Sequence, residues 1–502
     1  MNANVYKLLV DRFLQDPSRP CLETASGRTY SYADLERETA RLARFFTEHG
    51  IAPGERIAAQ ADKSPEALFL YLAALRAGLI YLPLNTAYQR GEMEYFLADA
   101  KPAVVVCRPQ ALALTQELAQ AAGTRFMYTL DETGGGTLMD ASRYTPAEFD
   151  TAVVGPDDLA VILYTSGTTG RSKGAMLTHG NIASNTLTLH AYWGFRPDDV
   201  LLHALPIFHV HGLLIAANLS LLSTGKMFFL KRFDVKQVVG YLPRATVFMG
   251  VPTYYTRLLA EPGFTRDVCR GVRLFISGSA PLLKETFEAF QQRTGHAILE
   301  RYGMSETGMN TSNPLAGERV AGTVGPPLPG IALRVVGDDG GPLPAESVGH
   351  IQVKGPNVFR GYWGMPEKTH EDFTADGYFK TGDVGKLDAR GYLTIVGRSK
   401  DLVISGGYNV YPKEIETLID EMPEVVESAV IGVPHPDFGE AVTAVIVAKP
   451  GAGLTETEVI QRLKGDIANY KVPKRVYFVD ELPRNAMGKV QKNTLRERYG
   501  AG

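Results

Sequence analysis

Apolar residues along the first 320 positions follow two periods in alternation. Ser31 can cap a helix with Asp34 at its third position, and Ser64-Pro65 can begin another that ends before Gly78. Short apolar runs typical of buried strands separate such helices, at residues 80–84, 102–107, 159–164, 200–205, 245–250 and 272–276. This alternation predicts α/β layers with largely parallel sheets.

The pattern changes near Gly322, where shorter strands and many Gly/Pro turns follow. Strand-like runs at residues 331–336, 349–354 and 392–396 predict a small barrel or an antiparallel sheet. After Arg398 we expect a compact unit with helices at 412–420 and 455–463 and strands at 425–433, 441–448 and 475–479. The fold prediction is therefore an α/β large N-terminal domain over residues 1–398, with layered sheets, helices and a small β-barrel-like part. A smaller α+β C-terminal domain over residues 399–502 follows it.

Composition narrows the class of protein. The chain has 502 residues, of which 45% are hydrophobic, which favours packed domains throughout. A net charge of −3, from 52 basic and 55 acidic residues, argues against binding nucleic acid or an anionic membrane through bulk charge. No apolar run reaches the length of a membrane span, and the N-terminus lacks a signal-peptide pattern. The three cysteines, Cys21, Cys107 and Cys269, are far apart, so we expect reduced thiols in a cytoplasmic protein.

The most informative stretch is residues 165–174, which follow one of the apolar runs. They contain three glycines, five hydroxyl side chains and two cations. Glycines allow a close approach of the main chain to a ligand, and N–H groups, hydroxyls and a lysine suit a polyphosphate. The ending differs from the Gly-Lys-Ser/Thr of the usual P-loop. The alternative is a flexible surface loop, which would be hard to exclude from this motif alone.

Five further motifs accompany the loop in order along the chain. They are residues 206–212 (PIFHVHG), 277–281 (SGSAP), 302–306 (YGMSE), 381–383 (TGD) with 397–401 (GRSKD), and 483–489 (PRNAMGK). Their order and spacing resemble those of the acyl- and aryl-CoA synthetase superfamily of adenylate-forming enzymes. The resemblance covers essentially the whole chain, and six motifs in sequence are much stronger than any one of them.

The resemblance implies that a carboxylate attacks the α-phosphate of ATP and that pyrophosphate leaves. Two anions then meet, so cations and preorganised donors must surround the phosphates. Glu306 and Thr165 are expected to bind Mg²⁺, and Asp383 is expected to hold the ribose hydroxyls beside Arg398. The expected ATP-binding residues are Thr165, Ser166, Gly167, Thr168, Thr169, Gly170, Lys173, Ser279, Ala280, Pro281, Glu300, Arg301, Tyr302, Gly303, Met304, Ser305, Asp383 and Arg398. The alternatives are an ordinary exposed glutamate for Glu306 and a common turn for Thr-Gly-Asp.

The resemblance also implies a mobile C-terminal domain. Lys489 matches the catalytic lysine that bridges the carboxylate and the α-phosphate, a task that suits a compact charge with three donors. Lys400 matches the hinge, and Gly406 and Gly407 would line the tunnel for the CoA thiol, where a Cβ would obstruct passage. An exposed Lys489 would also be open to regulatory acetylation enzymes.

In the residues expected to bind the acid, this sequence differs from most members of the superfamily. Many fatty and aryl acid ligases have glycine before the tyrosine of the YGMSE motif, whereas this chain has Arg301. Arg257 lies in residues 251–258, which border the acyl pocket in the superfamily. A buried guanidinium beside an apolar tail is costly, whereas a second carboxylate would pair with it. Ser277 and His209 are expected as further donors, and the pattern is similar to that of malonyl-CoA synthetases within the superfamily. The alternative for Arg301 is a salt bridge to a neighbouring acidic side chain.

The histidine pair has a separate alternative. His209 and His211, two residues apart on a strand, would point the same way and are candidate metal ligands. No third ligand has suggestive spacing, so we expect His209 at the acyl pocket with a catalytic role and His211 to be packed.

The function prediction is an AMP-forming ligase that uses ATP, Mg²⁺, CoA and a small dicarboxylic acid, malonate or methylmalonate. A stand-alone enzyme that loads a carrier-protein thiol, a ligase for another short acid, an inactive nucleotide sensor and a luciferase-like oxygenase remain alternatives.

Overall fold

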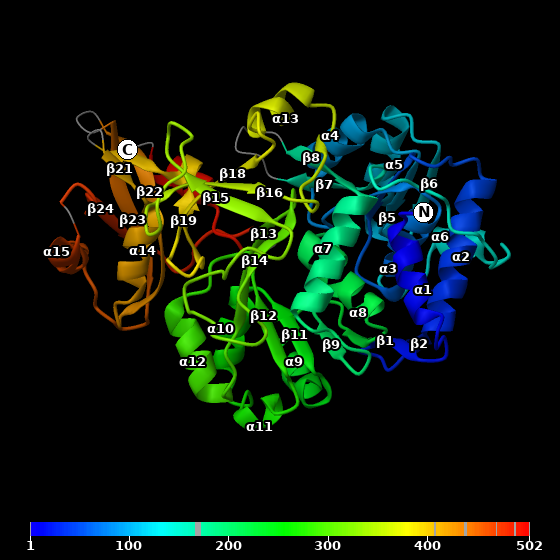
Figure 1. The fold of residues 1–502 in the computed structure, drawn as a ribbon, viewed down its shortest axis with the longest axis horizontal. Coiled ribbons are helices and arrows are strands. Elements are labelled where there is room, and N and C mark those ends of the chain that lie inside the picture. Colours follow the sequence, from blue (N-terminus) through cyan, green and yellow to red (C-terminus); the bar gives the residue numbers. More distant parts are fainter. Residues whose placement is uncertain are drawn as a thin grey trace.

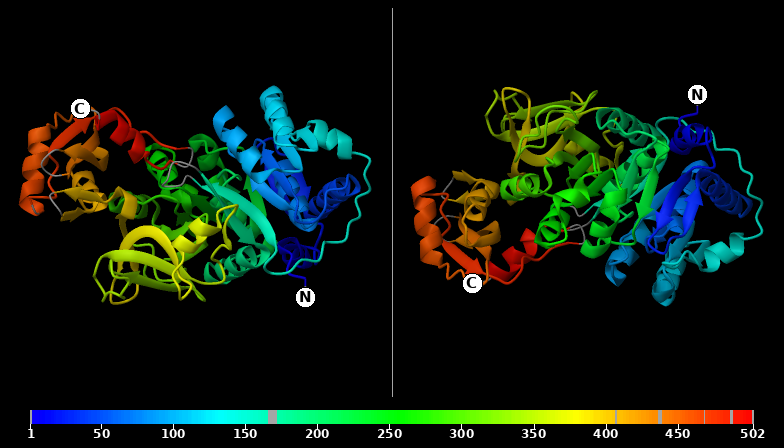
Figure 2. Two further views of the ribbon diagram at one scale, coloured as in Figure 1. Left: turned by 90° about the horizontal axis from the view of Figure 1, so that it is seen from above. Right: turned by 90° about the horizontal axis from the view of Figure 1, so that it is seen from below.

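The computed structural model describes residues 2–165, 172–405, 408–435, 439–467, 469–485 and 488–500. The chain forms a large N-terminal unit and a smaller C-terminal unit that lies at one end of it (Figure 1). Part of the C-terminal end of the chain, red in Figure 2, reaches from the small unit towards the large one. A side chain at Gly488 would lie 3.3 Å from the Thr253 hydroxyl of the large unit, so the two units are in contact there.

One large sheet has eight strands in the order β14-β13-β12-β11-β9-β10-β1-β2. Its strands are β1 (Pro20–Thr24), β2 (Thr29–Ser31), β9 (Val200–His203), β10 (Lys226–Phe229), β11 (Val247–Gly250), β12 (Leu274–Ser277), β13 (Leu299–Met304) and β14 (Gly308–Ser312). The inner pairs are parallel, and β2 and β14 add antiparallel edges.

The second large sheet has seven strands in the order β17-β8-β7-β4-β3-β5-β6. They are β3 (Arg56–Gln60), β4 (Ile80–Pro83), β5 (Val104–Cys107), β6 (Phe126–Thr129), β7 (Leu159–Thr165), β8 (Lys173–Thr178) and β17 (Gly361–Tyr362). Its β3–β7 part is parallel, and β8 and β17 run antiparallel. The prediction of α/β layers with largely parallel sheets is confirmed.

Helices cover and separate these sheets. They are α1 (Val5–Phe13), α2 (Tyr32–Glu48), α3 (Pro65–Arg76), α4 (Arg90–Ala100), α5 (Leu112–Ala121), α6 (Thr137–Ser142), α7 (His179–Tyr192), α8 (Asn218–Leu222), α9 (Val235–Tyr241), α10 (Pro252–Ala260), α11 (Arg266–Cys269), α12 (Lys284–Thr294) and α13 (Pro366–Asp372). Short 3₁₀ turns are η1 (Pro109–Ala111), η3 (Leu242–Arg244) and η4 (Ser399–Asp401), and η2 (His211–Ala217) is a π-helix. Helix α3 is apolar on nearly all sides and every residue in it is buried, in the core that joins residues of both large sheets.

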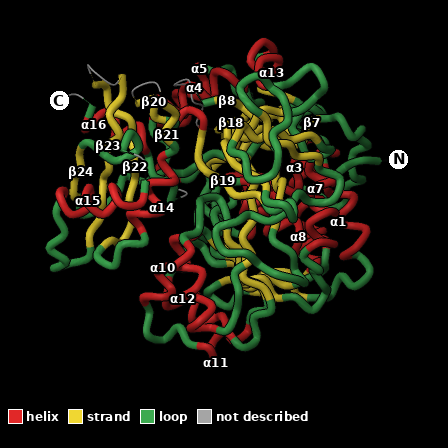
Figure 3. The backbone as a smooth tube through the Cα atoms, turned by 60° about the vertical axis from the view of Figure 1, so that its left-hand side comes forward, coloured by secondary structure: helices red, strands yellow, loops and turns green. Residues whose placement is uncertain are grey.

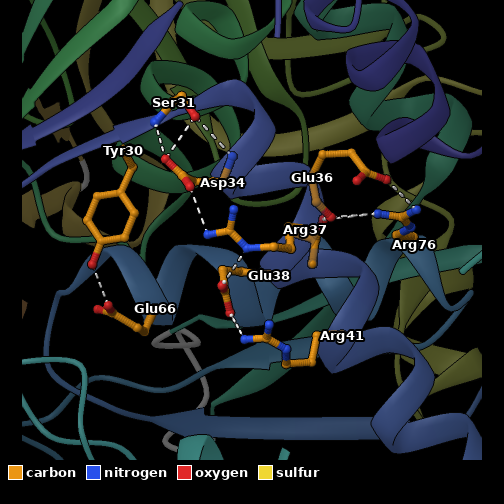
Figure 4. Close-up of polar contacts among 10 residues, drawn as sticks. Tyr30, Ser31, Asp34, Glu36, Arg37, Glu38, Arg41, Glu66 and Arg76 are labelled. Carbon is orange, nitrogen blue, oxygen red and sulfur yellow. Dashed lines mark hydrogen bonds and ion pairs between the residues drawn. The ribbon is translucent and has the colours of Figure 1, made fainter. Parts of the chain in front are cut away.

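The helix starts that the sequence predicted are confirmed. Ser31 accepts from the Asp34 amide and its own amide donates to the Asp34 carboxylate, which completes a capping box. Figure 4 shows this cap and the ion pairs that continue along α2, including Arg37 with Asp34. On the other side of α2, Glu36 holds the Arg76 guanidinium, which ends α3. The polar contacts fix α2 against α3.

A four-stranded antiparallel sheet follows in the order β15-β16-β18-β19. Its strands are β15 (Ala332–Val336), β16 (Gly349–Lys354), β18 (Phe379–Leu387) and β19 (Leu393–Arg398). The antiparallel alternative that the sequence offered for this region is therefore confirmed.

The C-terminal unit is an α+β structure, as predicted. It contains β20 (Val403–Ser405), β21 (Tyr408–Val410), β22 (Val425–His435), β23 (Gly439–Ala448), β24 (Arg475–Phe478), α14 (Pro412–Asp420), α15 (Glu456–Asp466) and α16 (Lys492–Tyr499). Helices α14 and α15 pack on one face of its sheet, and α16 packs on the other (Figure 3). Among the described residues, no helix is both long and apolar enough to cross a membrane. The three cysteines are buried free thiols.

Candidate active site

The predicted motifs meet at one end of the eight-stranded sheet. Parallel strand β12 ends at Ser277, and its neighbour β13 carries the residues from Glu300 to Met304. Carboxyl ends of adjacent parallel strands are where open α/β sheets bind ligands. Hairpin β18–β19 adds Asp383, which lies opposite Arg398 in the register. Residues far apart in the sequence thus form one site.

Asp383 is buried and bonded on both carboxylate oxygens. The Tyr302 hydroxyl donates to Oδ2 over 2.5 Å, and the Arg398 Nε lies 3.1 Å from Oδ1. The carboxylate raises the pKa of Arg398 above its usual value, and burial with the adjacent charge raises that of Tyr302. The contact orients the Tyr302 ring and the Asp383 carboxylate, both of which are among the expected ATP-binding residues.

Glu306 is a second buried carboxylate in the site. Its Oε1 accepts from the Tyr362 hydroxyl over 3.2 Å and lies 3.5 Å from the Thr165 hydroxyl. Burial raises the pKa of Glu306, while Arg398 and Lys173 oppose the shift. Two hard oxygen donors side by side suit Mg²⁺, which takes one or two carboxylates and completes its shell with phosphate and water. The donor set therefore fits the ion.

Lys173, the first residue of β8, is buried beside this carboxylate. Its ammonium lies 3.5 Å from an oxygen of Asp372 and 4.0 Å from the centre of the Tyr362 ring. The rest of the predicted phosphate loop, from Ser166 to Gly170, lies outside the described residues, as do Gly406 and Gly407 of the predicted thiol tunnel.

Lys489 keeps access to solvent but lies among the charged groups of the site. The surrounding protein and the Arg398 guanidinium lower its pKa to about 8, and the carboxylates of Asp383 and Glu306 oppose this shift. Its main chain closes a turn, since its amide donates to the Asn485 side chain. The lysine from the C-terminal unit is thus close enough to act electrostatically on groups of the large unit.

Arg301 is the most unusual group in the site. It is 3% exposed, and its Nε and Nη2 atoms are buried with no hydrogen-bonding partner among the residues that the structure describes. Burial lowers its pKa to about 9, which leaves it charged at neutral pH. The salt bridge considered as an alternative for Arg301 is not found within the described residues. An unpaired buried guanidinium is costly and calls for an anionic partner.

Other unpaired donors and acceptors lie in the same region. Ser277 is fully buried at the end of β12, and its hydroxyl has no partner in the described part of the chain. His211 is buried with Nδ1 3.3 Å from the Ser279 hydroxyl, and burial together with the Arg301 charge lowers its pKa. Ser279 has a φ of 75°, a strained conformation that tends to occur at functional sites. The groups around Arg301 are therefore arranged for a polar ligand.

The prediction that His209 and His211 lie two apart on a strand is wrong. Strand β9 ends at His203, because Pro206 has no amide hydrogen with which to continue a ladder. His209 lies in a turn, and His211 begins a π-helix. Burial and the Lys489 charge lower the pKa of His209 to about 3, so the imidazole is neutral. The described residues contain no group of three or more His, Cys, Asp or Glu side chains placed to hold a metal.

Two of the predicted site residues, Arg257 and Glu300, differ in their exposure to solvent. Arg257 is exposed on α10, whereas Glu300 is buried with its Oε1 accepting from the Leu282 amide. Sequence reasoning overlooked Gly278: a Cβ there would lie 2.4 Å from the Arg301 Cζ. It also overlooked Tyr362 beside Glu306. The Ser-Gly-Ser run after a buried strand is the signal that points to Gly278.

Comparison with known proteins identifies the family. The family model of AMP-binding enzymes matches residues 10–363, and that of the AMP-binding enzyme C-terminal domain matches residues 414–489. The chain belongs to the AMP-binding enzyme family. The family and fold predicted from the six motifs are confirmed.

Individual relatives are similar over nearly the whole length. The crystal structure of ATP-bound MatB from Rhodopseudomonas palustris is 56% identical with a TM-score of 0.98, and covers 100% of this chain and 99% of its own. A malonate–CoA ligase from Arabidopsis thaliana is 35% identical over 94% of this chain and 85% of its own length. A feruloyl-CoA synthase from an Amycolatopsis species is 36% identical over 94% and 95%. The malonate–CoA ligase and the feruloyl-CoA synthase are almost equally identical to this chain, so sequence identity does not indicate which acid this chain binds. The geometry around Arg301 has to decide between such acids.

Proposed function

We propose that this protein is an AMP-forming acid–thiol ligase that activates malonate with ATP and transfers the malonyl group to CoA. The products are malonyl-CoA, AMP and pyrophosphate. Membership of the AMP-binding enzyme family and similarity to a malonate–CoA ligase support the reaction. The buried, unpaired Arg301 is the observation that carries the choice of a dicarboxylic acid.

Malonate matches the charges of the site. One carboxylate has to reach the nucleotide phosphate beside Lys489, and the other would pair with the free Nε and Nη2 of Arg301. The two cations already influence each other, since the Arg301 charge contributes to the lowered pKa of Lys489. Hydrogen bonds between charged partners stabilise by about 1.5–3 kcal/mol each. A monocarboxylic acid would leave the guanidinium buried without a partner, whereas Ser277 offers a further hydroxyl to the dianion.

Adenylation requires two anions to approach. A carboxylate oxygen of malonate forms a bond to the α-phosphorus of ATP, the bond to the bridging oxygen breaks, and pyrophosphate leaves with the electron pair. Lys489 would neutralise charge at the attacking carboxylate and α-phosphate, Asp383 would hold the ribose, and Lys173 would face the outer phosphates. Glu306 and Thr165 would hold Mg²⁺, which neutralises phosphate charge when bound.

Thioester formation needs a different arrangement. The CoA sulfur attacks the carbonyl carbon of the mixed anhydride, AMP leaves, and the thiol proton needs an acceptor. We assign that role to His209, whose pKa is low partly because of Lys489. If rotation of the C-terminal unit about Lys400 removes the lysine, the basicity of His209 rises when it is needed. Lys400 is exposed in η4, between the last strand of the large unit and the first of the small one.

The test is pyrophosphate release measured across acetate, malonate, methylmalonate, succinate and octanoate, with and without CoA. We expect malonate to have the highest kcat/KM, AMP to be the nucleotide product, and CoA to be consumed as malonyl-CoA. Higher kcat/KM with acetate or octanoate than with malonate would overturn the dicarboxylic acid, and formation of ADP would overturn the reaction. The predicted cytoplasmic location and the acetylation of Lys489 remain proposals that fractionation and acetyl-lysine mass spectrometry can test.

A further inference from the structure

A buried lysine outside the predicted site holds the loop that carries the two histidines. Lys63 lies between β3 and α3 and is 8% exposed. Its ammonium lies 2.8 Å from three atoms at and just after the end of β9: His203 Nδ1, His203 O and Leu205 O. It also lies 4.3 Å from the centre of the Phe229 ring. A lysine with this many main-chain and ring contacts is a built feature of the core and not a surface charge that happens to be covered.

His203 passes this contact on to the other end of the loop. Its Nε2 lies 2.9 Å from the Gly212 carbonyl, which only accepts, so Nε2 carries a hydrogen. The two ends of segment 206–212 touch, because a Cβ at Gly212 would lie 2.0 Å from the Pro206 carbonyl oxygen. Lys63 and His203 therefore fix the residues before the segment and its final residue.

The three contacts of the Lys63 nitrogen are all satisfied when the Lys63–His203 pair carries one proton more than its neutral form. If Lys63 is the ammonium, its three hydrogens serve three acceptors and His203 is neutral. If the proton moves to His203, the amine still donates to two carbonyls and accepts from Nδ1. Removing that proton altogether would leave one of these contacts without a hydrogen. No carboxylate pairs with Lys63 among the described residues, and burial lowers its pKa and that of His203.

The clamped segment carries groups of the acid pocket. His209 lies within it, and His211 precedes Gly212 and contacts Ser279. Burial and the Arg301 charge both lower the pKa of His211. A change at Lys63 would therefore reach the pocket through one buried side chain, without any contact between Lys63 and the bound acid.

We propose that Lys63 is a positioning residue for the acid substrate: with His203 it clamps segment 206–212 and so sets His209 and His211 relative to Arg301. The proposal rests on the proposed function, since its readout is the use of malonate. It concerns the acid half of the site and leaves the nucleotide half unchanged.

The experiment compares Lys63→Met with Arg76→Met. Arg76 is a matched control: it is also a buried cation, it ends the helix that Lys63 precedes, and its side-chain partners Glu36, Tyr6 and Thr39 are not among the predicted site residues. We expect Lys63→Met to lower kcat/KM for malonate roughly 10- to 100-fold, as displaced binding groups do, with an unchanged KM for ATP. Discrimination against malonamate, in which an amide replaces one carboxylate, should fall as well. Arg76→Met should lower Tm without changing kcat/KM for malonate or the discrimination against malonamate.

A second pair of variants keeps the test decisive. His203→Gln retains an N–H for Gly212 and an oxygen for Lys63, so it should keep kcat/KM for malonate close to that of the wild type. His203→Leu offers neither group and should lower it. If Lys63→Met yields no folded protein, Lys63→Gln and His203→Leu must show the same result, a lower kcat/KM for malonate with an unchanged KM for ATP. Normal malonate kinetics in Lys63→Met, or equal loss of malonate and ATP binding, would overturn the proposal. A wild-type enzyme that does not use malonate would instead overturn the proposed function.

Discussion

Arg301→Met should lower activity with malonate and raise the stability of the free protein. Methionine retains an unbranched side chain but removes the unpaired guanidinium, whose Nε and Nη2 are free in the described structure. Two lost charge-assisted bonds at the lower figure correspond to about 3 kcal/mol, so we expect a roughly 100- to 1,000-fold fall in kcat/KM. Removal of an uncompensated buried charge should stabilise the fold by about 1–4 kcal/mol.

The assay pairs malonate-dependent pyrophosphate release with thermal unfolding. Arg319→Met is the matched control, because the Arg319 guanidinium donates to the carbonyls of Pro314, Ala297 and Leu315. That variant should lose stability and keep its preference for malonate. Malonamate should be used equally well or better by Arg301→Met, since the lost pairing involves only the second carboxylate. Unchanged malonate kinetics in Arg301→Met, or a lower Tm than wild type, would refute the reasoning.

Four further outcomes are expected. Since Lys489 must be protonated and its pKa is about 8, kcat/KM for adenylation should fall as pH rises through about 8; a flat profile to pH 9.5 would contradict this. Gly278→Ala should displace the Arg301 guanidinium and lower kcat/KM for malonate about tenfold without changing KM for ATP, as initial rates can check. Glu306→Gln should raise the Mg²⁺ concentration needed for half-maximal pyrophosphate release, and an unchanged titration would remove Glu306 from the ion site. Lys400→Pro should form the acyl-adenylate yet stall the thioester step, which a quenched-flow assay of both products measures; normal malonyl-CoA output would argue against the hinge.

Sequence reasoning succeeded where the signal is local. The Ser31 capping box, the Ser64-Pro65 start of α3 and the apolar strand runs depend on neighbouring residues, so the layered fold followed from them. The motifs that come together around Asp383 and Glu306 followed from the resemblance to a family. Arg301 was identified because it departs from that family.

The remaining features depend on contacts that no local pattern encodes. The bonds between Lys63 and His203 join residues 140 positions apart, one in the loop after β3 and the other at the end of β9 in the other large sheet. The π-helix that begins at His211 replaces an expected strand, and the exposure of Arg257 depends on how α10 packs. Whether a buried charge has a partner is also a property of the folded structure alone, and Arg301 is the example of a charge that has none in the described structure.

The energetics of the pocket link its stability to its choice of acid. The Arg301 charge contributes to the lowered pKa of Lys489 in the free protein, and two nitrogens of the Arg301 guanidinium have no hydrogen-bonding partner in the described structure. In the described structure the Arg301 guanidinium therefore carries a positive charge that no carboxylate pairs with. A dianion relieves this repulsion at both ends, whereas a monoanion relieves it at one. Discrimination between dicarboxylic and monocarboxylic acids then comes from the unfavourable charge in the ligand-free pocket. Substitutions that stabilise the pocket by removing this charge should therefore weaken the preference for malonate.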